Sequence, residues 1–399
     1  MKELRFFLLV GCVTFLSPFF LLVSAVSGYD EGTSTITISF DFSIGNDTNI
    51  VEYQEEIDDW FYTIIPKFVV SIPREQSDFS LAYSLRYDDY ITETDFKNLS
   101  QNIDFISRID LGDRLTFVLT DKFVDSLYGI WRDETDSISG SEYFVNTLSP
   151  ELKYVSYSGA FTVDLSYVYM QEKWDVVSAN DWEINQVTAA MSITPGLNLS
   201  LGVFGTFTQK DYRDIMFDYT SSYIGVHMSY KISRIADISL SIGLNSRDYK
   251  GQEDPDDQIR WNLSLDRVFT EITSFKFSLF HRYYDSEVFL GDFYTNSGIG
   301  LDYSNEILND RLQLFLKGQY LLNKYQNLGN QELKSDAERA REDRLFRVYA
   351  GVGLKLLDWI ALQFFYGYSI RDSNLDQFDI EDSRYELHLK FTRKLHFEF

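Results

Sequence analysis

Long stretches of this sequence alternate apolar and polar side chains one by one, from Thr33 to the last residue. Clear examples are residues 36–44, 79–87, 238–244 and 360–368. Because successive side chains of a strand point to opposite faces, a period of two predicts β-strands with one apolar face each. About eighteen such segments follow one another, most of about 9 to 13 residues. That length is sufficient for a tilted strand to cross a lipid bilayer.

The connections between these segments are of two kinds, and the two kinds alternate. Short turns are expected at residues 73–78, 110–114, 156–158, 194–196, 233–237, 270–274, 307–311 and 357–359. Long polar connections are expected at residues 46–59, 88–99, 121–144, 172–181, 209–219, 248–258, 285–295, 323–344 and 371–382. Tight turns at one end and long loops at the other are typical of an outer-membrane barrel. The sequence therefore predicts an all-β fold, a single transmembrane antiparallel up-and-down β-barrel of about 18 strands.

The pattern of the strands and the composition exclude several other classes of protein. A soluble sandwich would have shorter strands and equivalent loop ends, and a propeller would show a repeated blade signature, which this sequence lacks. A mean hydropathy of −0.21 with 24% charged residues excludes a bundle of membrane helices. The net charge of −25, most of it in the long connections, argues against nucleic acid as a partner.

Aromatic residues gather near the ends of the expected strands, where a membrane barrel carries its interfacial girdles. The girdle at the loop ends is predicted to contain Tyr87, Tyr90, Tyr167, Tyr169, Tyr283 and Tyr368. The girdle at the turn ends is predicted to contain Trp359, Phe397 and Phe399. The lipid bilayer of the outer membrane is therefore the first expected partner.

The first residues have the layout of a secretory signal peptide. Lys2 and Arg5 precede an apolar stretch at residues 6–26, and small residues follow it. We expect residues 1–28 to be a cleaved signal peptide and residues 29–399 to form the barrel. A retained anchor and lipidation at Cys12 are the two alternatives.

The last segment places Tyr385, Leu387, Leu389, Phe391, Leu395, Phe397 and Phe399 on one face. A terminal Phe after such a pattern is similar to the signal that the barrel-assembly machinery reads. We therefore assign Phe399 as an assembly signal and expect that machinery as a partner.

A wider resemblance covers most of the chain. Residues 81–87, 98–103, 111–117, 146–154 and 194–199 resemble strands and turns of the beta-barrel porin 2 family. The resemblance implies an exported barrel of 18 strands. It also implies a link to exopolysaccharide synthesis and secretion, and carries no catalytic motif.

Enzyme chemistry finds no support in the residues. Four histidines occur, and the pattern brings none of them together with a serine and an acid. The acidic run at residues 254–257 lacks the spacing and the glycine of a calcium loop. We predict no enzyme activity, no catalytic residue, no cofactor and no metal site.

The inward face of the barrel is the expected functional surface. Acids on this face, such as Asp41, Asp104 and Asp164, come mostly from the first half of the chain. Small inward residues, among them Gly202, Ser241, Gly351, Gly353 and Gly367, are expected to leave an aqueous lumen. The predicted pore-lining residues from the second half are Arg260, Lys276, Phe280, Arg282, Phe315, Lys317, Arg347, Tyr349, Lys355, Phe365 and Lys390.

These residues are open to two interpretations. They form either the polar wall of any water-filled barrel, or a cationic and aromatic surface matched to an anionic polymer whose sugar rings could stack on the aromatics. Residues 331–345 depart from alternation and predict a short helix that narrows the pore or caps a loop.

With the resemblance, the first expectation is a conduit that exports an exopolysaccharide delivered by a periplasmic partner. The alternatives are a general or solute-selective diffusion porin and a structural barrel with acidic adhesive loops.

Overall fold

The computed structural model describes residues 33–49, 57–93, 98–126, 143–174, 181–213, 218–250, 257–270, 273–285, 292–308, 311–327 and 341–397. Its elements are eighteen strands and one short 3₁₀ helix, η3 (Asp376–Phe378). The strands are β1 (Ser34–Asp47), β2 (Asp59–Pro73), β3 (Ser77–Tyr90), β4 (Asn98–Asp110), β5 (Leu115–Ser126), β6 (Tyr143–Val155), β7 (Phe161–Trp174), β8 (Trp182–Ile193), β9 (Leu199–Tyr212), β10 (Tyr219–Ser233), β11 (Ala236–Tyr249), β12 (Gln258–Thr270), β13 (Thr273–Asp285), β14 (Asp292–Ile307), β15 (Leu312–Asn327), β16 (Glu342–Leu357), β17 (Ile360–Ser373) and β18 (Ile380–Phe397). Within the part of the chain that the structure describes, no helix is long and apolar enough to cross a membrane.

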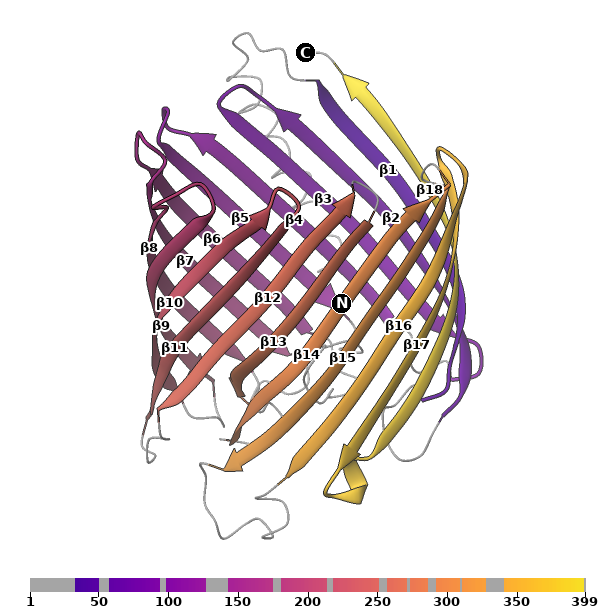
Figure 1. The fold of residues 1–399 in the computed structure, drawn as a ribbon. Helices are drawn as coiled ribbons and strands as arrows, with labels where there is room; N and C mark the ends of the chain where they lie inside the picture. The colour runs from indigo at the N-terminus through magenta and orange to yellow at the C-terminus, as the bar shows by residue number, and fades with distance from the viewer. Residues whose placement is uncertain are drawn as a thin grey trace.

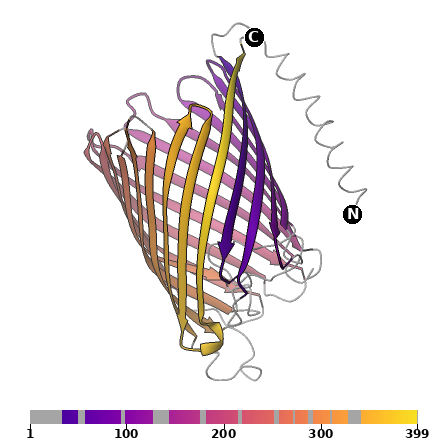
Figure 2. The same cartoon turned by 90° about the vertical axis from the view of Figure 1, so that its right-hand side faces the viewer.

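The strands form one closed barrel (Figures 1 and 2). Each strand pairs antiparallel with its neighbours in the sequence, from β1 with β2 to β17 with β18. The last strand then pairs with the first, with Lys390 opposite Asp41 and Phe397 opposite Ser34. In Figure 1 the short turns and both ends of the strand series lie at the top. The predicted up-and-down barrel of 18 strands is confirmed.

Two details of the prediction were wrong. The strands contain 12 to 18 residues, and most are longer than the predicted 9 to 13. They continue past the apolar band, where both faces are polar and alternation no longer marks a strand. The helix predicted at residues 331–345 does not extend to its expected end, because β16 begins at Glu342. Residues 331–340 of that predicted helix lie outside the described residues.

The outer face of the barrel is apolar and accessible. Ile224 on β10 is 68% exposed, and apolar side chains elsewhere on the wall are 39% to 54% exposed, for example Ile38, Phe68, Leu165, Val203, Val226, Leu244, Ile299, Phe346 and Phe364. In water, apolar surface costs about 25 cal/mol per Å². A continuous apolar band on a closed sheet is therefore the surface of a barrel that spans a lipid bilayer.

The aromatic girdle at the loop ends is only partly as predicted. Tyr87 lies on the outer face, where it and Tyr62 donate hydrogen bonds to Asp89 at 2.9 and 2.8 Å. Tyr90 instead faces inward and is buried against Phe61, with ring centroids 5.6 Å apart. Tyr90 ends β3 three residues after Tyr87, so strand alternation places the two rings on opposite faces.

Several of the small inward residues do not leave open space. The Phe315 ring lies over Gly351, and the His227 ring lies over Gly202. The backbone positions of these glycines are close to side chains of the neighbouring strands, so a Cβ atom at either one would collide with a ring. The expectation that these glycines widen the lumen was therefore wrong. They accommodate rings that cover the inner wall.

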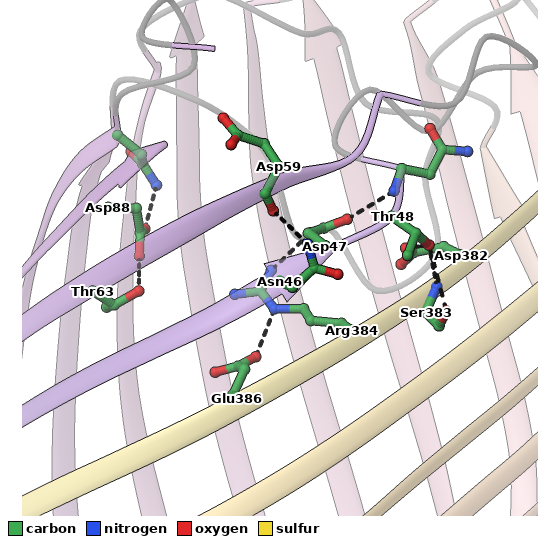
Figure 3. A network of polar contacts seen from close by, with 12 residues as sticks. Asn46, Asp47, Thr48, Asp59, Thr63, Asp88, Asp382, Ser383, Arg384 and Glu386 are labelled. Atoms are coloured by element: carbon green, nitrogen blue, oxygen red, sulfur yellow. Dashed lines mark hydrogen bonds and ion pairs between the residues drawn. The ribbon is translucent and has the colours of Figure 1, made fainter. Parts of the chain in front are cut away.

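The junction between the first and last strands is held by buried charges (Figure 3). Arg384 on β18 is 8% exposed and contacts Glu386 at 2.6 Å and Asp47 of β1 at 3.3 Å. Its guanidinium also lies 4.1 Å from the centre of the Phe61 ring. Next to it, His388 contacts Glu386 at 2.7 Å and Asp41 at 3.1 Å. The two strands most distant in sequence are thus joined by ion pairs as well as by the sheet.

Replacing Arg384 with Ala leaves the buried Asp47 carboxylate without the cation that contacts it and leaves Glu386 in contact with His388 alone. Removing one partner of a buried ion pair costs about 3–5 kcal/mol, and we expect a loss of this size in the free energy of unfolding. Urea titration in detergent micelles, followed by circular dichroism, measures it. The control Arg393→Ala removes an exposed arginine from the same strand. Equal, small losses for both variants would contradict the assigned role.

Replacing Gly351 with Ala places a methyl group against the Phe315 ring. Overpacking of this kind costs about 1–3 kcal/mol of unfolding free energy. The cost should fall in a Phe315→Ala background, although the Phe364 carbonyl oxygen remains close. Gly353→Ala is the control, because the new methyl group there meets mainly the flexible Gln363 side chain at 3.3 Å. The same titration compares the four variants, and an unchanged cost without the ring would exclude this packing.

Candidate luminal binding surface

The register of the strands settles which side chains share the inner face. Arg384 and Glu386 of β18 lie on the inner face at the junction. Residues paired directly opposite each other in neighbouring strands share a face, so the register identifies the inward residues of every other strand. All eleven residues predicted to line a pore lie on it. They are Arg260 on β12, Lys276, Phe280 and Arg282 on β13, Phe315 and Lys317 on β15, Arg347, Tyr349 and Lys355 on β16, Phe365 on β17 and Lys390 on β18.

Charge is distributed unevenly over this face. In the first half of the chain, inward acids lie opposite inward lysines, with Asp104 facing Lys122 and Asp164 facing Lys153. Predicted cations of the second half are in part neutralised in the same way. Lys276 contacts Asp266 at 3.4 Å, Lys355 contacts Asp358 at 3.1 Å and Lys390 contacts Asp41 at 3.4 Å.

Three of the other predicted cations have no ion-pair partner among the described residues. Arg260, Arg282 and Lys317 make no ion pair with any residue that the structure describes. Arg260 lies over the Tyr223 ring, 4.8 Å from its centre, and Arg282 lies 4.3 Å from the centre of the Phe280 ring. An aromatic face attracts a cation without cancelling its charge. Arg260 and Arg282 therefore keep their positive charge on the second half of the inner wall, whereas Lys317 lies opposite Asp302.

A cavity of about 490 Å³ opens on the inner face of β15 to β18. Five of its lining residues are basic and come from four of these strands and β3; two, Asp382 and Glu386, are acidic. The basic residues are Arg86, Lys317, Arg347, Arg371 and Arg384. Its wall thus combines positive charge with a volume that suits a small solute.

An aromatic cluster stands at one side of this cavity. The Tyr349 ring stacks on Phe365 at 5.3 Å and on Phe315 at 6.4 Å, and the His388 ring meets Phe365 edge-on at 4.8 Å. Phe365 is only 9% exposed, whereas Tyr349 is 38% exposed. The rings therefore cover one another, and Tyr349 presents the accessible surface.

Phe280 does not offer a ring to the lumen either. It is 5% exposed and packs against Leu321 and Leu345 on the inner face of neighbouring strands. Of the four aromatics on which sugar rings could stack, Phe280 and Phe365 are buried against their neighbours, Phe315 is half-buried and Tyr349 is exposed.

Sequence reasoning missed several inward charges. Arg86, Arg247, Arg371 and Arg384 all lie on the inner face. Arg86 lies inside the alternating residues 79–87, where its direction could have been predicted, whereas Arg247, Arg371 and Arg384 lie beyond the clearly alternating residues of their strands. Counting in steps of two from the apolar part of each strand would have found them.

Other predictions fall outside the described residues. These are the signal peptide at residues 1–28, the assembly signal at Phe399, and most of the acidic run at residues 254–257. Among the residues that are described, no group of three potential ligands is placed to hold a metal ion.

Comparison with known proteins gives similarity in structure only. No family model matches the sequence, and no curated protein matches it. The chain is similar to the siderophore receptor PirA from Pseudomonas aeruginosa, with 11% identity, a TM-score of 0.48, and coverage of 92% of this chain and 81% of that one. It is also similar to OccK3 (OpdO) from Pseudomonas aeruginosa, with 10% identity, a TM-score of 0.48 and coverage of 91% and 96%. OccAB3 from Acinetobacter baumannii has 10% identity, a TM-score of 0.46 and coverage of 91% and 99%.

Proposed function

We propose that this protein is an outer-membrane channel through which small solutes diffuse, and that the charge of its inner wall makes it selective. The observation that carries the proposal is the contrast between the two faces of one closed sheet. The outer face is apolar and exposed, while the inner face carries charged side chains around a cavity of about 490 Å³. Charge of this density on the inner face requires water beside it.

The size of the barrel supports the same conclusion. Barrels of eight strands are filled by side chains, whereas barrels of 16 to 18 strands leave room for an aqueous channel. The eighteen strands of this chain belong to the second group. Membrane barrels with short turns at one end and long loops at the other occur in outer membranes, and the expected signal peptide fits export to that location.

Export of a polysaccharide, which the family resemblance implies, has weaker support. Aromatic rings on which sugars could stack were the sequence feature that favoured a polymer, and of the four predicted rings only Tyr349 is exposed. The periplasmic delivery partner and the barrel-assembly machinery stay predictions from the sequence. Diffusion needs neither an aromatic track nor a delivery partner, so we place it before export.

The decisive experiment is to insert the purified mature protein into a planar lipid bilayer. We expect stepwise increases in current, because water-filled lumens conduct ions. A variant lacking residues 328–340 is measured beside it, since this deletion removes most of the helix predicted at residues 331–345 to narrow the pore or cap a loop. Liposome swelling with glucose then reports whether an uncharged solute passes.

The outcomes separate the candidates. Conductance together with swelling in small solutes supports diffusion. Silence of both the complete protein and the variant lacking residues 328–340 would sink the channel proposal. Bilayers that receive detergent and buffer alone provide the background for both recordings.

A further inference from the structure

His388 on β18 lies between two carboxylates on the inner face of the barrel. Its Nε2 atom is 2.7 Å from Glu386 Oε2, and its Nδ1 atom is 3.1 Å from Asp41 Oδ1. Glu386 precedes it by two residues on the same strand, whereas Asp41 belongs to β1, the strand with which β18 pairs when the barrel closes. The ring therefore connects the two strands at the closure.

The two contacts together identify the protonation state of the ring. A neutral imidazole has one N–H donor and one nitrogen that only accepts, whereas an imidazolium donates from both nitrogens. An ionised carboxylate only accepts. Since each ring nitrogen of His388 has a carboxylate oxygen at hydrogen-bond distance, the imidazolium is the form that satisfies both contacts.

A cation stands on the other side of each carboxylate. Arg384 Nε contacts Glu386 Oε1 at 2.6 Å (Figure 3), and Lys390 Nζ contacts Asp41 Oδ2 at 3.4 Å. In order along these contacts, the groups are Arg384, Glu386, His388, Asp41 and Lys390. Their charges alternate in sign only if His388 carries a proton. A neutral ring would leave two negative groups facing each other across it.

The surroundings make this row of charges sensitive to the proton. The side chains of His388 and Glu386 are 13% exposed, and that of Asp41 is 19% exposed. The Phe365 ring of β17 meets the imidazole edge-on, with the centroids 4.8 Å apart. Because little water reaches the contacts, the charges interact more strongly than they would on an open surface. Loss of the proton is therefore felt by both strands.

His388 is the group in this neighbourhood that is suited to titrate near neutral pH. The charged groups in its row come from β18 and β1, while β17 places Gln363 opposite it and Phe365 against it, and neither of these titrates. Other charged or titratable residues line the cavity beside it, and they are Arg86, Lys317, Arg347, Tyr349, Arg371 and Asp382. Carboxyl groups, phenols and guanidinium groups ordinarily titrate far from neutral pH.

We propose that His388 carries a proton at neutral pH and acts as a pH-sensitive link between β18 and β1. At alkaline pH the ring releases this proton to water and becomes neutral, so Asp41 and Glu386 repel each other and the closure becomes weaker. The same release removes one positive charge from the wall of the cavity. This second consequence concerns the passage of ions and rests on the proposed channel function.

The protonation state can be measured directly by ¹⁵N nuclear magnetic resonance of the purified mature protein in detergent micelles, with labelled histidine. The signals of the other three histidines are assigned from the variants His227→Gln, His281→Gln and His396→Gln, which identifies those of His388 in the intact protein. At neutral pH we expect a hydrogen on both ring nitrogens of His388. A hydrogen on only one of them would overturn the proposal.

Stability gives an independent measurement. A histidine in the unfolded chain loses its proton near about pH 6.5. Below that pH both the folded and the unfolded protein carry the proton, so its contribution is constant. Above that pH the equilibrium constant for unfolding should rise by up to about tenfold per pH unit, until the folded protein also releases the proton. Urea titrations followed by circular dichroism measure this constant on both sides of neutral pH.

Three variants assign the effect to His388. His396→Gln removes an exposed histidine from the same strand and should keep the pH dependence of the wild-type protein. His388→Gln should lose that dependence and, at neutral pH, raise the unfolding constant about tenfold or more, because hydrogen bonds to charged groups are lost. His388→Lys supplies a cation that persists at alkaline pH, so it should also lose the dependence but be less destabilised. Equal pH dependence in the wild-type and His388→Gln proteins would contradict the link.

Ion selectivity tests the consequence for the channel. With unequal potassium chloride concentrations across a planar bilayer, the reversal potential of the wild-type protein should shift toward cation selectivity as the pH becomes alkaline. The shift should be smaller in His388→Lys. A protein without current would contradict the channel, while the spectra and the urea titrations still decide the link. Equal shifts in both proteins would contradict the effect of His388 on ions and leave the channel in place.

Discussion

Backbone hydrogen bonding in lipid is the constraint on which this structure depends. Inside a bilayer no water can satisfy an exposed N–H or C=O group, so a sheet must close on itself. Here closure is the pairing of β18 with β1, from Phe397 opposite Ser34 to Arg384 opposite Asp47. Every other strand pair is made by two strands that follow each other in the sequence, whereas β18 and β1 are the last and the first strand of the series. This pairing is also where Arg384, Asp47 and Glu386 add buried ion pairs to the sheet.

Closure reverses the usual distribution of polarity. With the apolar faces turned to lipid, the charged and polar side chains of the membrane-spanning strand segments lie in the interior, where their charges remain paired or hydrated. The first half of the chain balances acids against lysines, as at Asp104 and Lys122. The second half instead holds Arg260 and Arg282 on aromatic rings. The inner wall therefore has one region in which acids and lysines face each other and another in which Arg260 and Arg282 keep their positive charge. The second region would attract a diffusing anion.

Aromatic rings have two roles in this barrel that the sequence does not separate. On the outer face, Tyr62 and Tyr87 bring their hydroxyls to Asp89 at the edge of the apolar band. On the inner face, Phe315 lies over Gly351, and Phe280 packs against Leu321. Inward rings of this kind fill the wall and position cations, which explains why so little aromatic surface is left open for sugars.

Alternation by itself determined the strand count, the two classes of connection and the face of every predicted pore-lining residue, because the two-residue period of a strand is a local property. Strand ends were predicted less well, since the wall continues beyond the apolar band where Arg247 and Arg371 have polar neighbours on both faces. Only the tertiary structure decided which inward charges are neutralised. That depends on the stagger between strands, which places Lys390 beside Asp41 across the closure and leaves Arg260 near Arg282 and Arg247. Stagger arises from the geometry of the closed sheet, so no single strand encodes it.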